Sequence, residues 1–281
     1  MFRISLHCLL LLLVFDSSAK EIRITPESDL KPVLKQAEPG DTILMEDGIW
    51  KDVKLRFERL MGTEKEPIHL RAESPGKVVL TGSSQVRVSG EYVIVSGLSF
   101  LNPEDEGDVF EFRTHSERHA HHCRITDCSF MQTKPGSDEK SLWVNVYGTH
   151  NRVDHCYFAR KQNKGTTLVV WVTETPGEHR IDHNYFGPRP ELGENGGETI
   201  RIGISDTSEF NSRTIVESNY FEKCNGEGEI ISNKSCENIY RFNLFERCEG
   251  SLTLRHGHRC LVDGNVFLGH KVNGTGGVRI I

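Results

Sequence analysis

The sequence predicts an all-β fold, a single-stranded parallel β-helix in which each repeat of the chain forms one coil. Segments that end in phenylalanine recur along the chain, and each one alternates apolar and polar residues. No long stretch has the period of an amphipathic helix. The segments are VIVSGLSF (ending at Phe100), CRITDCSF (Phe130), NRVDHCYF (Phe158), HRIDHNYF (Phe186), TIVESNYF (Phe221), IYRFNLF (Phe245) and CLVDGNVF (Phe267).

The spacing of these segments excludes other repeat architectures. Successive phenylalanines are 30, 28, 28, 35, 24 and 22 residues apart, shorter than the roughly 40 residues of a propeller blade. The leucine pattern of leucine-rich repeats is missing. Short β-rich segments broken by glycine, asparagine and aspartate fit coils whose equivalent residues stack about 4.8 Å apart.

A second column of residues accompanies the phenylalanines. From the second segment onward, the residue two positions before the phenylalanine is cysteine or asparagine: Cys128, Cys156, Asn184, Asn219, Asn243 and Asn265. Stacked phenylalanines would form the core, and asparagine at a bend would satisfy backbone groups of the neighbouring coil. We therefore expect both columns to be structural.

The N-terminal segment has the features of an export signal, which we assign to residues 1–19. Arg3 supplies a positive charge, the apolar run CLLLLLVF is too short to span a bilayer, and small residues precede a cleavage point after Ala19. The mature chain would begin at Lys20. We expect it to be periplasmic or secreted, with no membrane association after cleavage.

Residues 20–281 are expected to form one β-helix domain with a cap at its beginning. Leu30–Ala37 predicts a short helix that covers the first coil and protects its edge. At the other end the chain stops at GGVRII, in the middle of a strand pattern. We therefore expect the domain to be truncated at its C-terminal end.

Charge and cysteine content exclude several functional classes. A net charge of −6 argues against a nucleic-acid partner. No CxxC motif is present, which excludes zinc-knuckle and thioredoxin-like sites. The cysteines of the mature chain are expected to be mostly small buried side chains, and those on stacked coils would lie within disulfide range. They are Cys123, Cys128, Cys156, Cys224, Cys236, Cys248 and Cys260.

The stretch GEGEIISNKS places two carboxylates two residues apart. On a strand, Glu227 and Glu229 point to the same face, and their mutual repulsion would be relieved by a bound cation. A solvated acidic edge is the alternative for such a pair taken alone.

Counting residues back from the phenylalanine of each repeat places two cationic side chains near these carboxylates. Lys234 lies 11 residues before Phe245, and Arg255 lies 12 residues before Phe267. The two side chains would therefore be neighbours on stacked coils. A neutral lysine in such a site can act as a general base.

Four motifs carry a family resemblance. They are NGGETIRIGIS (195–205), NYFEKCNGEGEIISNKS (219–235), LTLRHG (252–257) and GGVRI (276–280). In this order they resemble polysaccharide lyase family 6, which comprises alginate lyases and chondroitinase B. The resemblance implies a right-handed, pectate-lyase-like solenoid that cuts uronate polysaccharides by β-elimination with Ca²⁺.

The resemblance also implies roles for individual residues. Asn195, Glu227 and Glu229 would bind Ca²⁺. Lys234 would be the Brønsted base and Arg255 the Brønsted acid. The substrate would be an anionic uronate polysaccharide, with alginate favoured and dermatan or chondroitin sulfate as the alternative.

Three further residues are candidates around this site. Glu198 competes with Asn195 as a ligand, because the long unit between Phe186 and Phe221 prevents repeat counting from placing either residue. Arg201 and His256 flank the proposed site and would bind substrate carboxylates. A structural salt bridge is an equal alternative for Arg201.

Two other functional classes remain open. A hydrolase would use Glu227 and Glu229 as acid and base, but two carboxylates on one strand do not straddle a glycosidic bond well. A non-catalytic carbohydrate-binding solenoid fragment is the other alternative. The histidines of HSERHAHHC are expected on a solvated or carbohydrate-facing surface in preference to a metal site; they are His115, His119, His121 and His122.

Overall fold

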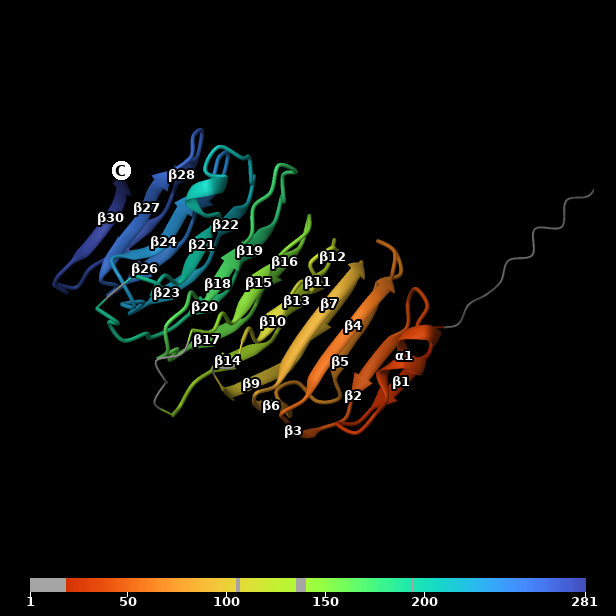
Figure 1. The fold of residues 1–281 in the computed structure, drawn as a ribbon. Coiled ribbons are helices and arrows are strands. Elements are labelled where there is room, and N and C mark those ends of the chain that lie inside the picture. Colours follow the sequence, from red (N-terminus) through yellow and green to blue (C-terminus); the bar gives the residue numbers. More distant parts are fainter. Residues whose placement is uncertain (1–18, 105–106, 135–139, 194) are drawn as a thin grey trace, which may run out of the picture.

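The protein is a right-handed parallel β-helix, seen in a computed structural model that describes residues 19–104, 107–134, 140–193 and 195–281 (Figure 1). The predicted export signal lies outside these residues except for Ala19. No helix in the described ranges has the length and apolar character needed to cross a bilayer. Most coils contribute one strand to each of three sheets, here named A, B and C.

Sheet A places one apolar residue per coil in the core. Ile125, Val153, Ile181 and Val216 pair in register on successive strands, and all four are buried. Its strands, in spatial order, are β1 (Glu21–Ile24), β2 (Thr42–Met45), β5 (Ile68–Ala72), β8 (Val93–Ser96), β13 (Arg124–Thr126), β16 (Arg152–Asp154), β19 (Arg180–Asp182), β22 (Ile215–Glu217), β25 (Ile239–Arg241) and β28 (Leu261–Asp263).

Sheet B carries the phenylalanine column. The rings stack from Phe100 to Phe267, with centroids of successive rings 4.3–5.0 Å apart, which confirms the predicted repeat. Its strands are β3 (Gly48–Lys51), β6 (Val78–Gly82), β9 (Leu98–Pro103), β14 (Ser129–Met131), β17 (Tyr157–Ala159), β20 (Tyr185–Phe186), β23 (Tyr220–Glu222), β26 (Leu244–Glu246) and β29 (Val266–Leu268).

Sheet C presents its outward side chains to the candidate site. Ile200, Ile231 and Leu252 pair in register on neighbouring strands and are fully buried, so they point inward. The residues directly before and after them on each strand therefore point outward. Its strands are β4 (Lys54–Met61), β7 (Gln85–Glu91), β10 (Phe110–Glu111), β11 (Arg113–His115), β12 (Arg118–His121), β15 (Val144–Val146), β18 (Leu168–Val170), β21 (Ile200–Ile202), β24 (Glu229–Lys234), β27 (Gly250–His256) and β30 (Thr275–Ile280).

The asparagine column is structural, as predicted. Oδ1 of Asn219 accepts a hydrogen bond from the backbone N–H of Asn184 at 3.0 Å, and Oδ1 of Asn243 accepts one from Asn219 at the same distance. Nδ2 of Asn219 donates to the carbonyl of Ile181 at 2.9 Å. Each side chain thus replaces the backbone pairing that is lost where the chain bends between sheets A and B.

A short helix covers the N-terminal end of the solenoid (Figure 1). Helix α1 (Leu30–Gln36) begins after Asp29, whose carboxylate accepts a hydrogen bond from the backbone N–H of Lys31 at 3.0 Å. Its apolar side chains, including Val33, pack against the core. The capping helix is confirmed, and it ends one residue before the predicted limit because Ala37 is already extended.

The cysteines form no disulfide in the described residues. All are buried except Cys260, which is half-buried, as expected for small core side chains. Burial raises the pKa of Cys123 to about 12, so this thiol is unreactive at neutral pH.

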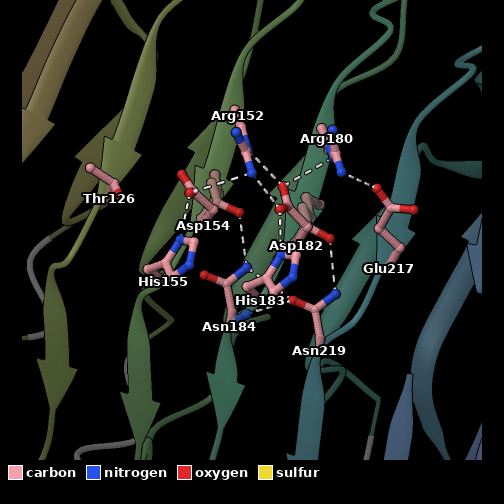
Figure 2. Close-up of polar contacts among 12 residues, drawn as sticks. Thr126, Arg152, Asp154, His155, Arg180, Asp182, His183, Asn184, Glu217 and Asn219 are labelled. Atoms are coloured by element: carbon pink, nitrogen blue, oxygen red, sulfur yellow. Dashed lines mark hydrogen bonds and ion pairs between the residues drawn. The ribbon is translucent and has the colours of Figure 1, made fainter. Parts of the chain in front are cut away.

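The outward face of sheet A carries a lattice of arginine, aspartate and histidine (Figure 2). Nε of Arg152 donates to Asp182 at 2.8 Å, and Nδ1 of His183 lies 2.7 Å from the same carboxylate. Burial opposes ionisation of Asp182, but these hydrogen bonds outweigh burial and lower its pKa. The paired charges mark this face as a structural surface, distinct from the candidate site on sheet C.

Candidate active site

A cleft of about 770 Å³ opens at the outward face of sheet C near its C-terminal coils. It brings together the five residues predicted from the sequence: Asn195, Glu227, Glu229, Lys234 and Arg255. The remaining lining residues are Glu191, Gly193, Ser205, Asn225, Gly228, Glu249, Gly250, Gly274 and Arg279. Carboxylates and cations therefore share one polar depression.

Glu227 is fixed by the backbone of the preceding coil. Its Oε2 accepts hydrogen bonds from the N–H groups of Gly196 and Gly197, at 2.7 and 3.0 Å. Burial, the nearby carboxylate of Glu198 and, to a smaller extent, Glu229 raise the pKa of Glu227 against the effect of these hydrogen bonds. A bound cation would relieve that cost.

Glu229 has a different set of partners. Its Oε1 accepts from Nη1 of Arg255 at 2.7 Å, and its Oε2 accepts from the hydroxyl of Ser232 at 2.5 Å. The carboxylate is buried, whereas the side chain of Arg255 is 43% exposed. The guanidinium therefore reaches from solvent into the cleft.

A β-bulge sets the direction of Arg255. In the pairing of β24 with β27, Asn233 lies opposite Leu254 and Lys234 lies opposite His256, so Arg255 is the extra residue. This bulge accounts for the one-residue difference in the spacing of Lys234 and Arg255 from their phenylalanines. Bulges commonly redirect a side chain beside a functional site.

The structure separates Asn195 from its competitor Glu198. Asn195 lines the cleft. Glu198 is 1% exposed and accepts a hydrogen bond from the hydroxyl of Thr166 at 2.9 Å, beneath the surface. Asn195 is therefore the residue positioned to meet a ligand.

Arg189 is a residue that sequence reasoning missed. Its guanidinium is buried and donates to the carbonyls of Gly197 and Glu198, each at 2.9 Å, and to those of Asn163 and Gly165 at 3.0 and 2.8 Å. Burial lowers its pKa to about 10. Arg189 thus secures the loop whose N–H groups hold Glu227, and no repeat or motif in the sequence marks it.

Arg201 and His256 do not line the cleft. The guanidinium of Arg201 lies 5.5 Å from the ring centre of Trp171, and no carboxylate pairs with it in the described residues. The side chain of His256 is exposed, and its carbonyl accepts from Nδ2 of Asn233 at 2.6 Å. Within the described residues Arg201 therefore forms no salt bridge, the structural alternative that the sequence left open for it.

The oxygen atoms of the cleft fit a hard cation. Glu227, Glu229 and Asn195 offer carboxylate and amide oxygens, the ligand types that Ca²⁺ prefers. Within the described ranges, no three His, Cys, Asp or Glu side chains form a metal site by themselves. The histidines of HSERHAHHC accordingly form none; His122, for example, stacks on Tyr92 and His150.

Comparison with known families identifies the class of protein. The family model of chondroitinase B matches residues 24–281. The chain therefore belongs to the chondroitinase B family, polysaccharide lyase family 6. No curated protein matches the chain significantly.

Solved structures of this family share the fold. The alginate lyase AlyGC is 48% identical with a TM-score of 0.88, over 93% of this chain and 36% of its own. A mannuronic acid specific family 6 lyase from human gut microbiota is 39% identical (TM-score 0.86, 93% and 62%). Pedsa3628, a family 6 polysaccharide lyase from Pseudopedobacter saltans, is 28% identical (TM-score 0.80, 92% and 60%). The chain thus spans between 36% and 62% of the length of these relatives.

Proposed function

We propose that this protein is a Ca²⁺-dependent polysaccharide lyase that cuts alginate by β-elimination. The observation that supports it is the convergence of Asn195, Glu227, Glu229, Lys234 and Arg255 on one cleft. A hydrolase with Glu227 and Glu229 as its acid and base is less consistent with this cleft, because Glu229 is already paired with Arg255.

Glu227, Glu229 and Asn195 would hold the cation at the cleft. Bound Ca²⁺ would act as a Lewis acid that neutralises the charge developing on the substrate carboxylate. The N–H groups of Gly196 and Gly197 keep one oxygen of Glu227 fixed and leave the other available. A carboxylate preorganised in this way loses little conformational freedom when it binds a ligand.

Lys234 and Arg255 would carry the proton transfers. Lys234 in its neutral form takes the proton from C5 of a uronate. The electron pair left behind forms the C4–C5 double bond, while the bond from C4 to the glycosidic oxygen breaks. Arg255 stabilises or protonates that leaving oxygen; its guanidinium is rarely an acid, so stabilisation of charge is a large part of this role.

Alginate is proposed as substrate because AlyGC, an alginate lyase, is 48% identical to this chain over the region that the two share. Dermatan sulfate is the second candidate, because the matching family model is described as chondroitinase B. Arg201 and His256 are proposed to bind substrate carboxylates beyond the cleft. Export to the periplasm or medium, where such a polymer would be met, completes the proposal and depends on the signal predicted in residues 1–19.

A substrate screen tests this function. The protein is incubated with polymannuronate, polyguluronate, alternating alginate and dermatan sulfate in the presence of Ca²⁺, and the ultraviolet absorbance of unsaturated uronate is followed. Absorbance should rise with at least one alginate and not with dermatan sulfate. Cleavage with new reducing ends but no absorbance would indicate a hydrolase, and binding without cleavage would indicate a carbohydrate-binding solenoid.

A further inference from the structure

We propose that Tyr147 and Trp171 form an aromatic strip that binds the polysaccharide substrate. The strip would contact uronate residues further along the same polymer chain whose cleaved bond lies at Lys234. The inference rests on the proposed function, because it extends the same binding site toward the N-terminal coils. It assigns a role to two side chains that neither the repeat nor the family motifs select.

The strip lies in line with the cleft on the outward face of sheet C. Val146, Val170, Ile202 and Asn233 are register partners on successive strands. The residue that follows each of them therefore occupies the next outward position, in the order Tyr147, Trp171, Gly203 and Lys234. At about 4.8 Å per coil, Trp171 lies about 10 Å and Tyr147 about 14 Å from Lys234 along the axis.

Gly203 keeps the position between Trp171 and Lys234 free of a side chain. Its φ is +79°, and a Cβ atom there would lie 2.5 Å from the carbonyl oxygen of Lys234. Glycine is therefore required at this coil. The outward position between the aromatic strip and the cleft therefore carries no side chain of its own.

The two rings form a supported aromatic stack. Tyr147 and Trp171 stack with centroids 5.7 Å apart and planes 7° apart, and both are half-buried. Nε1 of Trp171 donates to Oδ1 of Asn145 at 2.7 Å, which fixes the indole. The rings cover each other's facing sides, so the exposed part of the stack is the rigid apolar area against which a sugar ring would pack at low entropic cost.

Arginines flank the rings on the same face. Cζ of Arg113 lies 3.8 Å from the ring centre of Tyr147, and Cζ of Arg201 lies 5.5 Å from that of Trp171. Arg113 shares the carboxylate of Glu111 with Arg87, and the carboxylate of Asp108 also lies near these two arginines.

Arg201 adds a more direct indication of an anionic ligand. Its guanidinium pairs with no carboxylate in the part of the chain that the structure describes. Stacking of the rings alone would not require an unpaired cation, whereas a polymer with one carboxylate per sugar would supply its partner.

Binding of defined oligosaccharides tests the strip. Mannuronate disaccharide and hexasaccharide are titrated calorimetrically, with Ca²⁺ present, into a Lys234→Ala background that prevents cleavage. The hexasaccharide should bind at least about tenfold more tightly than the disaccharide. Trp171→Ala or Tyr147→Ala should each weaken hexasaccharide binding about tenfold and leave disaccharide binding within about twofold.

The controls separate this inference from the proposed function. Tyr157→Ala removes an exposed aromatic ring from sheet B and should change nothing, and Trp171→Phe, which keeps a ring, should retain most of the affinity. Circular dichroism confirms folding of each variant. Unchanged hexasaccharide affinity in Trp171→Ala and Tyr147→Ala would overturn the strip and leave the lyase proposal intact. A background protein that binds neither oligosaccharide would contradict both.

Discussion

Arg255 and Glu229 form an ion pair across neighbouring strands, with Nη1 of Arg255 2.7 Å from Oε1 of Glu229. The pair joins the residue proposed to stabilise the leaving oxygen to a residue proposed to bind Ca²⁺. The guanidinium and a metal ion would therefore compete for the negative charge of one carboxylate. This competition links the metal site to the proton-transfer residues.

Removal of Arg255 should consequently tighten Ca²⁺ binding even as it stops cleavage. In Arg255→Ala, Glu229 loses its cationic partner, and we expect the Ca²⁺ dissociation constant to fall about threefold to fivefold. The effect is modest because the arginine is partly exposed. Calorimetric titration of Ca²⁺ without substrate measures it.

Arg279→Ala is the matched control for that experiment. Arg279 lines the same cleft and forms no ion pair in the described residues, so its removal changes the local charge without freeing Glu229. An equal gain in Ca²⁺ affinity in both variants would show that the gain comes from the loss of one positive charge in the cleft and not from the release of Glu229. Weaker binding in Arg255→Ala would show that the two cations do not compete.

Arg189 lies beneath the site, and Arg189→Met should weaken Ca²⁺ binding without removing a ligand. The substitution removes one donor from each of four buried carbonyls, of which those of Glu198 and Asn163 keep a second donor, and it should destabilise the fold by roughly 2–4 kcal/mol. Because the same loop orients Glu227, we also expect Ca²⁺ affinity to decrease at temperatures where the variant is fully folded. Urea unfolding and Ca²⁺ titration measure the two effects, with Arg160→Met, at an exposed site, as control. Wild-type affinity in folded Arg189→Met would disprove the positioning role.

His179 should make the fold sensitive to acid. Burial lowers its pKa to about 3, and its Nδ1 accepts from the N–H of Asn151 at 3.1 Å, so the folded state keeps the ring neutral. The unfolded chain binds the proton near the ordinary pKa of about 6.5. Between these values the unfolded state holds more protons, so stability should be lost as pH falls from about 6.5 toward 3.

The variant His179→Asn isolates this contribution. Asparagine can accept the same backbone hydrogen bond without titrating, as Asn151 does for Cys123 on the coil before. Urea midpoints measured across the acidic range should fall less steeply in the variant than in the wild type. Parallel curves would show that His179 does not contribute to the acid sensitivity.

The fold could be predicted from the sequence because the parallel β-helix repeats its contacts. The phenylalanine and asparagine columns occur once per coil, so their spacing reveals the stacking that the structure shows from Phe100 to Phe267. Counting residues from the phenylalanine column also predicted that Lys234 lies close to Arg255. The spacings of the two residues from their phenylalanines, 11 and 12, differ by one, but this difference alone does not identify a β-bulge; the strand register does.

Other parts of the site could not be inferred from the repeat. Asn195 and Arg189 lie on the longest coil, where the chain departs from the repeat and counting fails. Tyr147 and Trp171 had a weak signal, since each directly follows an inward, outward, inward triplet: VNV before Tyr147 and LVV before Trp171. That signal gains meaning only when the register places both in the same outward row as Lys234, two and three coils away.

The rate at which unsaturated uronate forms in a double-mutant cycle at Lys234 and Arg255 tests the proposed elimination most directly. Both residues would act on one bond in one transition state. Each single alanine variant should therefore lower turnover of polymannuronate at least about 10³-fold, and the double variant should be about as slow as either one. Circular dichroism and oligosaccharide binding verify that the variants are folded. Near-normal formation of the chromophore in either single variant, or losses that simply multiply in the double variant, would contradict the proposal.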